Sequence, residues 1–142
     1  MHRRIEAVRT NHAWRWFLPL AAIAVFVMTR TPGHSFKVTE VSVQEAKSLV
    51  DAGALVVDVR GKAAYDKRHI PGAISAPLEE LRQAVPASIH AAADESIVVY
   101  CGDGVTIGPE GTQLLNTAGY AKAVNLKAGI DGWEDAGYPV LR

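Results

Sequence analysis

The residue best suited to covalent chemistry is Cys101, the only cysteine among the 142 residues. It follows an apolar run, residues 97–100, and precedes three glycines and a Pro-Glu pair: Gly102, Gly104, Gly108, Pro109 and Glu110. Glycines let the chain curl tightly and proline suits the first turn of a helix, so the pattern predicts a strand, a tight loop and a helix. Backbone N–H groups and the positive end of that helix would favour a thiolate, and therefore nucleophilic sulfur chemistry. A small buried cysteine without chemistry is the alternative.

Length and composition allow one ordinary globular domain. The chain is 49% hydrophobic and can bury a single core of the usual size. Five of its fifteen basic residues but only one of its fifteen acidic residues lie in residues 1–34, which leaves ten basic and fourteen acidic side chains in the remainder. A mildly acidic domain lacks the charge that binds phosphate backbones, so we expect no nucleic acid partner. A single cysteine without Cys and His clusters gives no zinc pattern, so we expect no metal site.

The N-terminal segment has the features of a membrane anchor. Residues 1–15 are basic, and an apolar run of thirteen residues begins at Trp16. We interpret residues 16–29 as a transmembrane anchor or uncleaved signal, although a span usually takes roughly 20 apolar residues. The preceding arginines would hold the N-terminus in the cytoplasm and place the rest of the chain on the extracytoplasmic (periplasmic) side. Secretion after signal cleavage is the alternative. Residues 30–35 are then a linker, and residues 36–142 are the domain.

Strand and helix patterns alternate along residues 36–142. Apolar or alternating stretches predict five strands, at residues 36–41, 55–57, 73–75, 97–100 and 123–126. A capping box from Ser42 to Glu45 predicts a helix that ends at Gly53. Two further helices are expected, one at residues 78–84 and one that starts at Pro109 and Glu110 and has its body at residues 112–117. Apolar strands separated by helices indicate a parallel sheet that is covered on both faces. We therefore expect an α/β fold of three layers, with a central parallel sheet of about five strands and ligands bound where the strands end.

A charged pair follows the second predicted strand. Asp58 and Arg60 lie two residues apart, so their side chains point to the same side. A charge-assisted hydrogen bond between them would fix neighbouring loops, and the same arrangement would serve substrate binding. We expect the structural role and keep Arg60 as a candidate substrate-binding residue.

Several short motifs, taken together and in order, resemble the rhodanese family from about Val38 to the C-terminus. They are Val57-Asp58-Val59-Arg60, His69-Ile70-Pro71-Gly72-Ala73, Val99-Tyr100-Cys101, Gly119-Tyr120 and Gly129-Ile130-Asp131-Gly132-Trp133. The resemblance implies a sulfurtransferase in which Cys101 takes a sulfane sulfur as a persulfide and passes it to a thiol or a cyanide-like acceptor. A protein is a further candidate acceptor, and no metal or organic cofactor is implied. The family's histidine supports the backbone, so we expect a structural role for His69.

The loop after Cys101 is expected to contact the substrate through Gly102, Asp103, Gly104, Val105, Thr106 and Ile107. Its sequence is similar to the C-G-x-G-V-T loop of mercaptopyruvate sulfurtransferases, whereas thiosulfate enzymes have the more basic C-R-K-G-V-T. A carboxylate at Asp103 would repel the thiosulfate dianion and oppose thiolate formation, so thiosulfate is expected to be a poor donor. Mercaptopyruvate enzymes bind the substrate carboxylate with arginines, for which Arg68 is an approximate counterpart, with Lys67 beside it.

Two other functions compete with sulfur transfer. Phosphatases that resemble rhodaneses use a C-x5-R loop whose arginine stabilises the transition state, but the residue six positions after Cys101 is Ile107. Without that arginine, phosphate-ester hydrolysis loses its main electrostatic support. The stronger alternative is a module without small-donor turnover, which binds a partner or relays sulfur between proteins.

Overall fold

The computed structural model describes residues 35–89, 91 and 93–142, and one compact unit extends from Phe36 to Arg142. Its single five-stranded sheet has the order β1-β5-β4-β2-β3, and all neighbouring strands are parallel. The strands are β1 (Glu40–Val41), β2 (Leu55–Asp58), β3 (Ile74–Ser75), β4 (Ile97–Tyr100) and β5 (Ala123–Leu126). The helices are α1 (Val43–Asp51), α2 (Lys62–Lys67), α3 (Leu78–Gln83), α4 (Gly108–Thr117) and α5 (Gly129–Asp135). The predicted α/β fold with about five parallel strands is confirmed.

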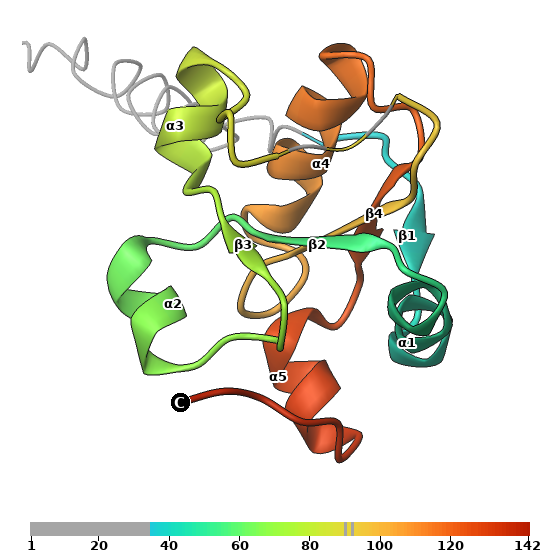
Figure 1. Ribbon diagram of the computed structural model, residues 1–142, viewed down its shortest axis with the longest axis vertical. Coiled ribbons are helices and arrows are strands. Elements are labelled where there is room, and N and C mark those ends of the chain that lie inside the picture. Colours follow the sequence, from blue (N-terminus) through green and yellow to red (C-terminus); the bar gives the residue numbers. More distant parts are fainter. Residues whose placement is uncertain (1–34, 90, 92) are drawn as a thin grey trace, which may run out of the picture. The chain divides into compact units, whose positions relative to one another are not determined.

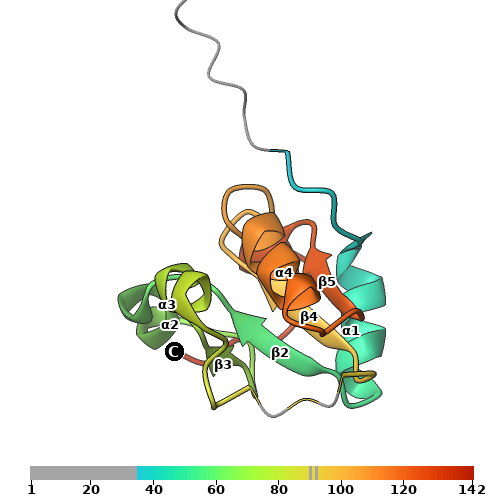
Figure 2. The same ribbon diagram turned by 90° about the horizontal axis from the view of Figure 1, so that it is seen from above.

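Each face of the sheet is covered by its own helices (Figure 1). Successive residues of a strand point to opposite faces, so Val56 and Val98 join the core that lies against α1, α2 and α5. Their neighbours Val57 and Val99 join the core against α3 and α4. Figure 2, seen from the α3 and α4 side, shows α4 lying over β4 and β5. These three layers place the end of β4 between both cores.

Local signals explain where α1 begins. Its N-cap Ser42 accepts a hydrogen bond from the Glu45 amide at 3.2 Å, and the Glu45 carboxylate accepts one from the Ser42 amide at 2.7 Å. This is the predicted capping box, in which two otherwise unpaired amides are satisfied. Gly53, just after the helix, has a φ of +97°, the left-handed conformation that ends helices.

The elements differ from the expectations in two respects. The strand predicted over residues 36–41 is limited to Glu40 and Val41, which pair with β5. Two short helices, α2 and α5, were missed. Neither has a side-chain N-cap hydrogen bond, and α2 buries no residue, so the sequence carries little helical signal there. Helix α4 begins at Gly108, next to the Pro109-Glu110 pair predicted to start it, and it contains the predicted 112–117 body.

The expected basic segment (residues 1–15), the anchor (residues 16–29) and nearly all of the linker (residues 30–35) lie outside the described residues. Among the residues that are described, no helix has the length and apolar character needed to cross a bilayer.

Candidate active site

Cys101 lies at the carboxyl end of β4, directly after Tyr100. The strand is fully buried, and Cys101 itself is only 1% exposed. The amide of Gly104 donates a hydrogen bond to Cys101 Sγ at 3.2 Å, and a φ of +79° at Gly104 turns the chain back toward the sulfur. A non-glycine residue would meet the backbone of Lys127 there, because its Cβ would lie 2.1 Å from the Lys127 carbonyl oxygen. The sulfur is therefore held in a tight turn that only glycine fits.

The carboxylate of Asp103 accepts hydrogen bonds from several other donors of the loop. Asp103 Oδ1 accepts the amides of Val105 and Thr106 at 2.9 and 3.0 Å, and Oδ2 accepts the Thr106 hydroxyl. Cys101 Sγ lies 3.4 Å from Asp103 Oδ1. The prediction of loop amides directed at the sulfur therefore holds for Gly104, whereas the amides of the next two residues bind Asp103 instead. The sequence predicted the Asp103 charge near the sulfur, but it did not predict the hydrogen bonds from the loop to the Asp103 carboxylate.

The N-terminus of α5 holds the start of the cysteine loop. The Ile130 amide donates to the Cys101 carbonyl at 2.9 Å, and the Asp131 amide donates to the Gly102 carbonyl at 3.1 Å. The first residue of α5, Gly129, has a φ of +59° and packs directly on this backbone. The family-like Gly129-to-Trp133 segment therefore positions Cys101 through the backbone, a role that its sequence did not reveal.

Asn125, in β5, is a site residue that sequence reasoning missed. Its side chain is fully buried, and its Nδ2 donates to the Gly104 carbonyl at 2.8 Å. Its Oδ1 has no hydrogen-bond partner among the described residues. A Cβ at Gly108 would lie 2.4 Å from this oxygen and 3.2 Å from Cys101 Sγ, so both atoms border the same small space. A polar residue in the otherwise apolar run 123–126 was the available signal.

We expect Asn125→Ala to loosen the cysteine loop. The substitution leaves the Gly104 carbonyl without its side-chain donor, which should lower the free energy of unfolding by about 1 to 3 kcal/mol. It should also change the rate at which iodoacetamide alkylates Cys101. Asn116→Ala is the matched control, because Asn116 Nδ2 donates to two backbone carbonyls, of Tyr120 and Ala123, away from this loop. Equal alkylation rates in both variants would mean that Asn125 does not position the loop.

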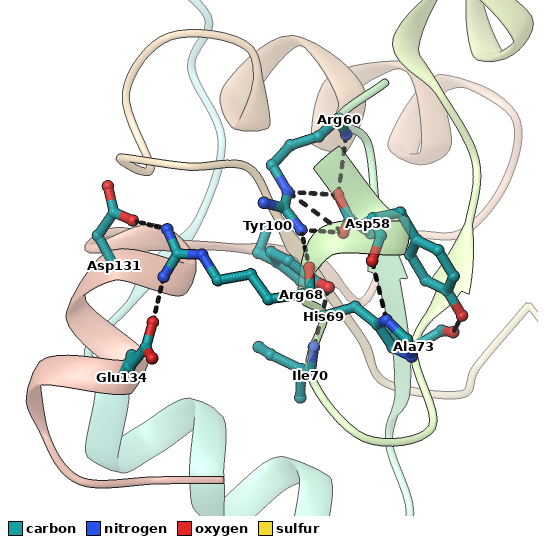
Figure 3. Close-up of polar contacts among 10 residues, drawn as sticks. Asp58, Arg60, Arg68, His69, Ile70, Ala73, Tyr100, Asp131 and Glu134 are labelled. Carbon is teal, nitrogen blue, oxygen red and sulfur yellow. Dashed lines mark hydrogen bonds and ion pairs between the residues drawn. The ribbon is translucent and has the colours of Figure 1, made fainter. Parts of the chain in front are cut away.

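Asp58 and Arg60 form a buried ion pair (Figure 3). The Asp58 side chain is 0% exposed and that of Arg60 is 11% exposed, with Arg60 Nη2 2.7 Å from Asp58 Oδ2 and Arg60 Nε 3.0 Å from Oδ1. Burial alone would lower the pKa of Arg60, but the hydrogen bond and charge of Asp58 outweigh it and raise that pKa. Arg60 Nη2 also donates to the Arg68 carbonyl at 2.7 Å. The pair therefore ties the end of β2 to the segment that follows α2, which fits the expected structural role.

Arg68 contacts α5 rather than the sulfur. Its guanidinium pairs with the carboxylates of Asp131 and Glu134 (Figure 3). These hydrogen bonds raise the pKa of Arg68, and the hydrogen bond to Asp131 has the largest effect. Neither Arg68 nor Arg60 makes a described hydrogen bond to a side chain of the cysteine loop. Substrate binding by these two arginines therefore stays a prediction.

His69 is held by backbone and ring contacts. Its Nδ1 lies 2.9 Å from the Tyr65 carbonyl oxygen, its ring stacks on that of Tyr65 at 4.0 Å, and its backbone pairs with Leu141. These contacts fit the structural role that is expected for His69.

The remaining loop candidates differ in their surroundings. Val105 is 66% exposed, so its side chain is open to a ligand or partner. Ile107 packs against the core that contains Cys101, and Thr106 is exposed but bound to Asp103. Their role in substrate binding stays a prediction.

Fold and site together define a class: an α/β protein whose sole cysteine lies in a glycine-rich loop at the carboxyl edge of a parallel sheet. A model of the rhodanese-like domain matches residues 42–136. The chain belongs to the rhodanese-like family.

Curated relatives include characterised and uncharacterised proteins. The Escherichia coli K12 protein YibN, described as uncharacterised, is 27% identical over 124 residues, which cover 87% of this chain and 86% of YibN. The human thiosulfate:glutathione sulfurtransferase is 33% identical over 105 residues, 66% of this chain and 90% of that protein. The thiosulfate sulfurtransferase GlpE of Actinobacillus pleuropneumoniae is 28% identical and covers 72% of this chain and 92% of GlpE.

Solved structures share the fold. A human single-domain sulfurtransferase aligns with a TM-score of 0.61 and 29% identity, covering 70% of this chain and 97% of that one. A rhodanese-related protein of Thermoplasma volcanium aligns with a TM-score of 0.62 at 24% identity, covering 72% and 97%, which is a likeness of fold alone.

Proposed function

We propose that this protein is a sulfurtransferase that moves sulfane sulfur from a donor to a thiophilic acceptor through a persulfide on Cys101. Candidate donors are 3-mercaptopyruvate, a persulfide and thiosulfate, and candidate acceptors are a thiol, cyanide or a protein thiol. The observation that carries the proposal is the position of Cys101, buried at the end of β4 with the Gly104 amide 3.2 Å from its sulfur. The two named sulfurtransferases among the relatives support it at low identity.

The reaction has two sulfur transfers. The Cys101 thiolate attacks the outer sulfur of the donor, the bond joining that sulfur to the donor breaks, and its electron pair leaves with the donor remnant. The acceptor then attacks the outer sulfur of the persulfide, and the S–S bond breaks with its electron pair returning to Cys101 as thiolate. An amide donating to the sulfur stabilises the negative charge present before and after each transfer.

The proposal is tested with the full chain by supplying thiosulfate or 3-mercaptopyruvate together with cyanide and measuring thiocyanate. Cys101→Ala should abolish turnover, because it removes the only thiol of the chain. Asp94→Asn is a suitable control, because Asp94 is an exposed residue before β4, at the opposite end of that strand from Cys101. Retained turnover in Cys101→Ala would contradict the proposal.

A protein-relay role is the second candidate, and the Val105 side chain, 66% exposed in the cysteine loop, is open to contact with a protein partner. In that case the wild-type chain should accept sulfur on Cys101 without steady turnover of small acceptors. Partner binding should then survive Cys101→Ala.

The proposal also includes an N-terminal membrane anchor with the domain on the extracytoplasmic side. It is supported by the apolar run that starts at Trp16 and by the arginines on its N-terminal side.

A further inference from the structure

The Asp103 carboxylate accepts hydrogen bonds from backbone amides of the cysteine loop. Successive backbone amides of a loop that leads into a helix form an anion-binding concavity. Here two of those amides, of Val105 and Thr106, donate to Asp103 Oδ1 at 2.9 and 3.0 Å, and the Thr106 hydroxyl donates to Oδ2. An anionic donor group would have to displace a carboxylate that is covalently part of the loop.

The same carboxylate places a negative charge beside the reacting sulfur. Asp103 Oδ1 is 3.4 Å from Cys101 Sγ. The hydrogen bond from the Thr106 hydroxyl, followed by those from the Val105 and Thr106 amides, holds the pKa of Asp103 well below its usual range. The charge therefore persists as the pH falls through about 4, where an ordinary aspartate becomes neutral.

No cation among the described residues pairs with Asp103. The two arginines predicted to bind substrate form ion pairs with other carboxylates. Arg60 pairs with Asp58. Arg68 pairs with Asp131 and Glu134. The charge is screened only by solvent, because the Asp103 side chain is exposed. Repulsion of a dianion should therefore be moderate and should weaken as salt is added.

We propose that Asp103 is a specificity-determining residue that selects donors with at most one negative charge next to the sulfane sulfur, such as an organic or protein-bound persulfide, over the thiosulfate dianion. This selection of donors concerns the proposed sulfurtransferase reaction and rests on that proposed function. The charge effect at Cys101 itself does not depend on turnover, so it can be measured separately.

The test compares alkylation of Cys101 by anionic iodoacetate and neutral iodoacetamide in the full chain. Cys101 is the only cysteine, so intact mass reports its modification directly. Asp103→Asn removes the charge and keeps an oxygen for the loop amides. It should raise the ratio of the iodoacetate rate to the iodoacetamide rate by about tenfold. Asp94→Asn should leave the ratio unchanged, because Asp94 is an exposed residue before β4, at the opposite end of that strand from Cys101. Asp103→Ser provides a second variant if the first does not fold.

An unchanged ratio in the Asp103 variants would overturn the inference. A second arm compares turnover of thiosulfate, a dianion, with benzenethiosulfonate, a monoanion. Asp103→Asn should lower the KM for thiosulfate several-fold more than that for benzenethiosulfonate. A raised alkylation ratio without turnover of either donor would support the charge effect and count against the proposed function. Equal changes in KM for both donors would overturn the selection.

Discussion

Gly129→Ala is expected to lower the free energy of unfolding by about 3 kcal/mol or more and to change the alkylation rate of Cys101. The backbone of Gly129 has a φ of +59°, and an added Cβ would lie 2.2 Å from the Gly102 carbonyl oxygen and 2.7 Å from the Cys101 carbonyl oxygen. These are backbone atoms of the cysteine loop and cannot turn aside as a flexible side chain would. The N-terminus of α5 must therefore move away, and its two hydrogen bonds to the loop carbonyls are lost. Urea unfolding and alkylation of Cys101 measure the two effects.

Gly137→Ala separates backbone strain from this steric clash. Gly137 also has a positive φ, +81°, but an added Cβ there meets no atom within 4 Å. It should cost only about 1 to 2 kcal/mol and leave Cys101 reactivity intact. If the two variants behave alike, close packing of Gly129 on the loop is not what holds the site.

Asp58→Ala is expected to lower the free energy of unfolding by about 3 to 5 kcal/mol, because it leaves the Arg60 guanidinium buried without its charge partner. The guanidinium would keep only its hydrogen bond to the Arg68 carbonyl and its position over the Tyr100 ring, 5.6 Å from the ring centroid. Chemical denaturation of the wild type and the variant measures this cost.

The exposed pair of Lys62 and Asp66 is the natural comparison for the buried one. It joins the same kinds of charge four residues apart on α2, with both side chains more than half exposed. Asp66→Ala should therefore change the free energy of unfolding by about 0.5 kcal/mol or less. A similarly small cost for Asp58→Ala would show that the buried pair does not stabilise the fold.

The fold could be predicted where the hydrophobic pattern is strong. The apolar runs of β2, β4 and β5 and the capping box at Ser42 produce the strands and the helix expected of them. Helices α2 and α5 could not be predicted in this way, because their stability comes from tertiary contacts. Helix α5, for example, is held by Trp133, which is buried and donates to the Pro139 carbonyl at 3.0 Å.

Only part of the site could be predicted, because some of its contacts also come from tertiary structure. Spacing alone places Cys101 after a buried strand and Asp103 two residues later. The contacts that hold the loop come from distant segments: Asn125 in β5 and the first amides of α5. Pairing between segments so far apart follows from the strand order, which places β5 next to β4, and the pattern of residues did not give that order.

Intact mass after incubation with a sulfane donor shows whether Cys101 carries sulfur. Because Cys101 is the sole cysteine, the wild-type chain should gain the mass of one sulfur atom, and Cys101→Ala should gain none. Added cyanide or thiol should return the wild-type mass to its starting value as the sulfur leaves. A chain that gains no sulfur from thiosulfate, benzenethiosulfonate, 3-mercaptopyruvate or an organic persulfide would show that Cys101 is not a sulfur carrier.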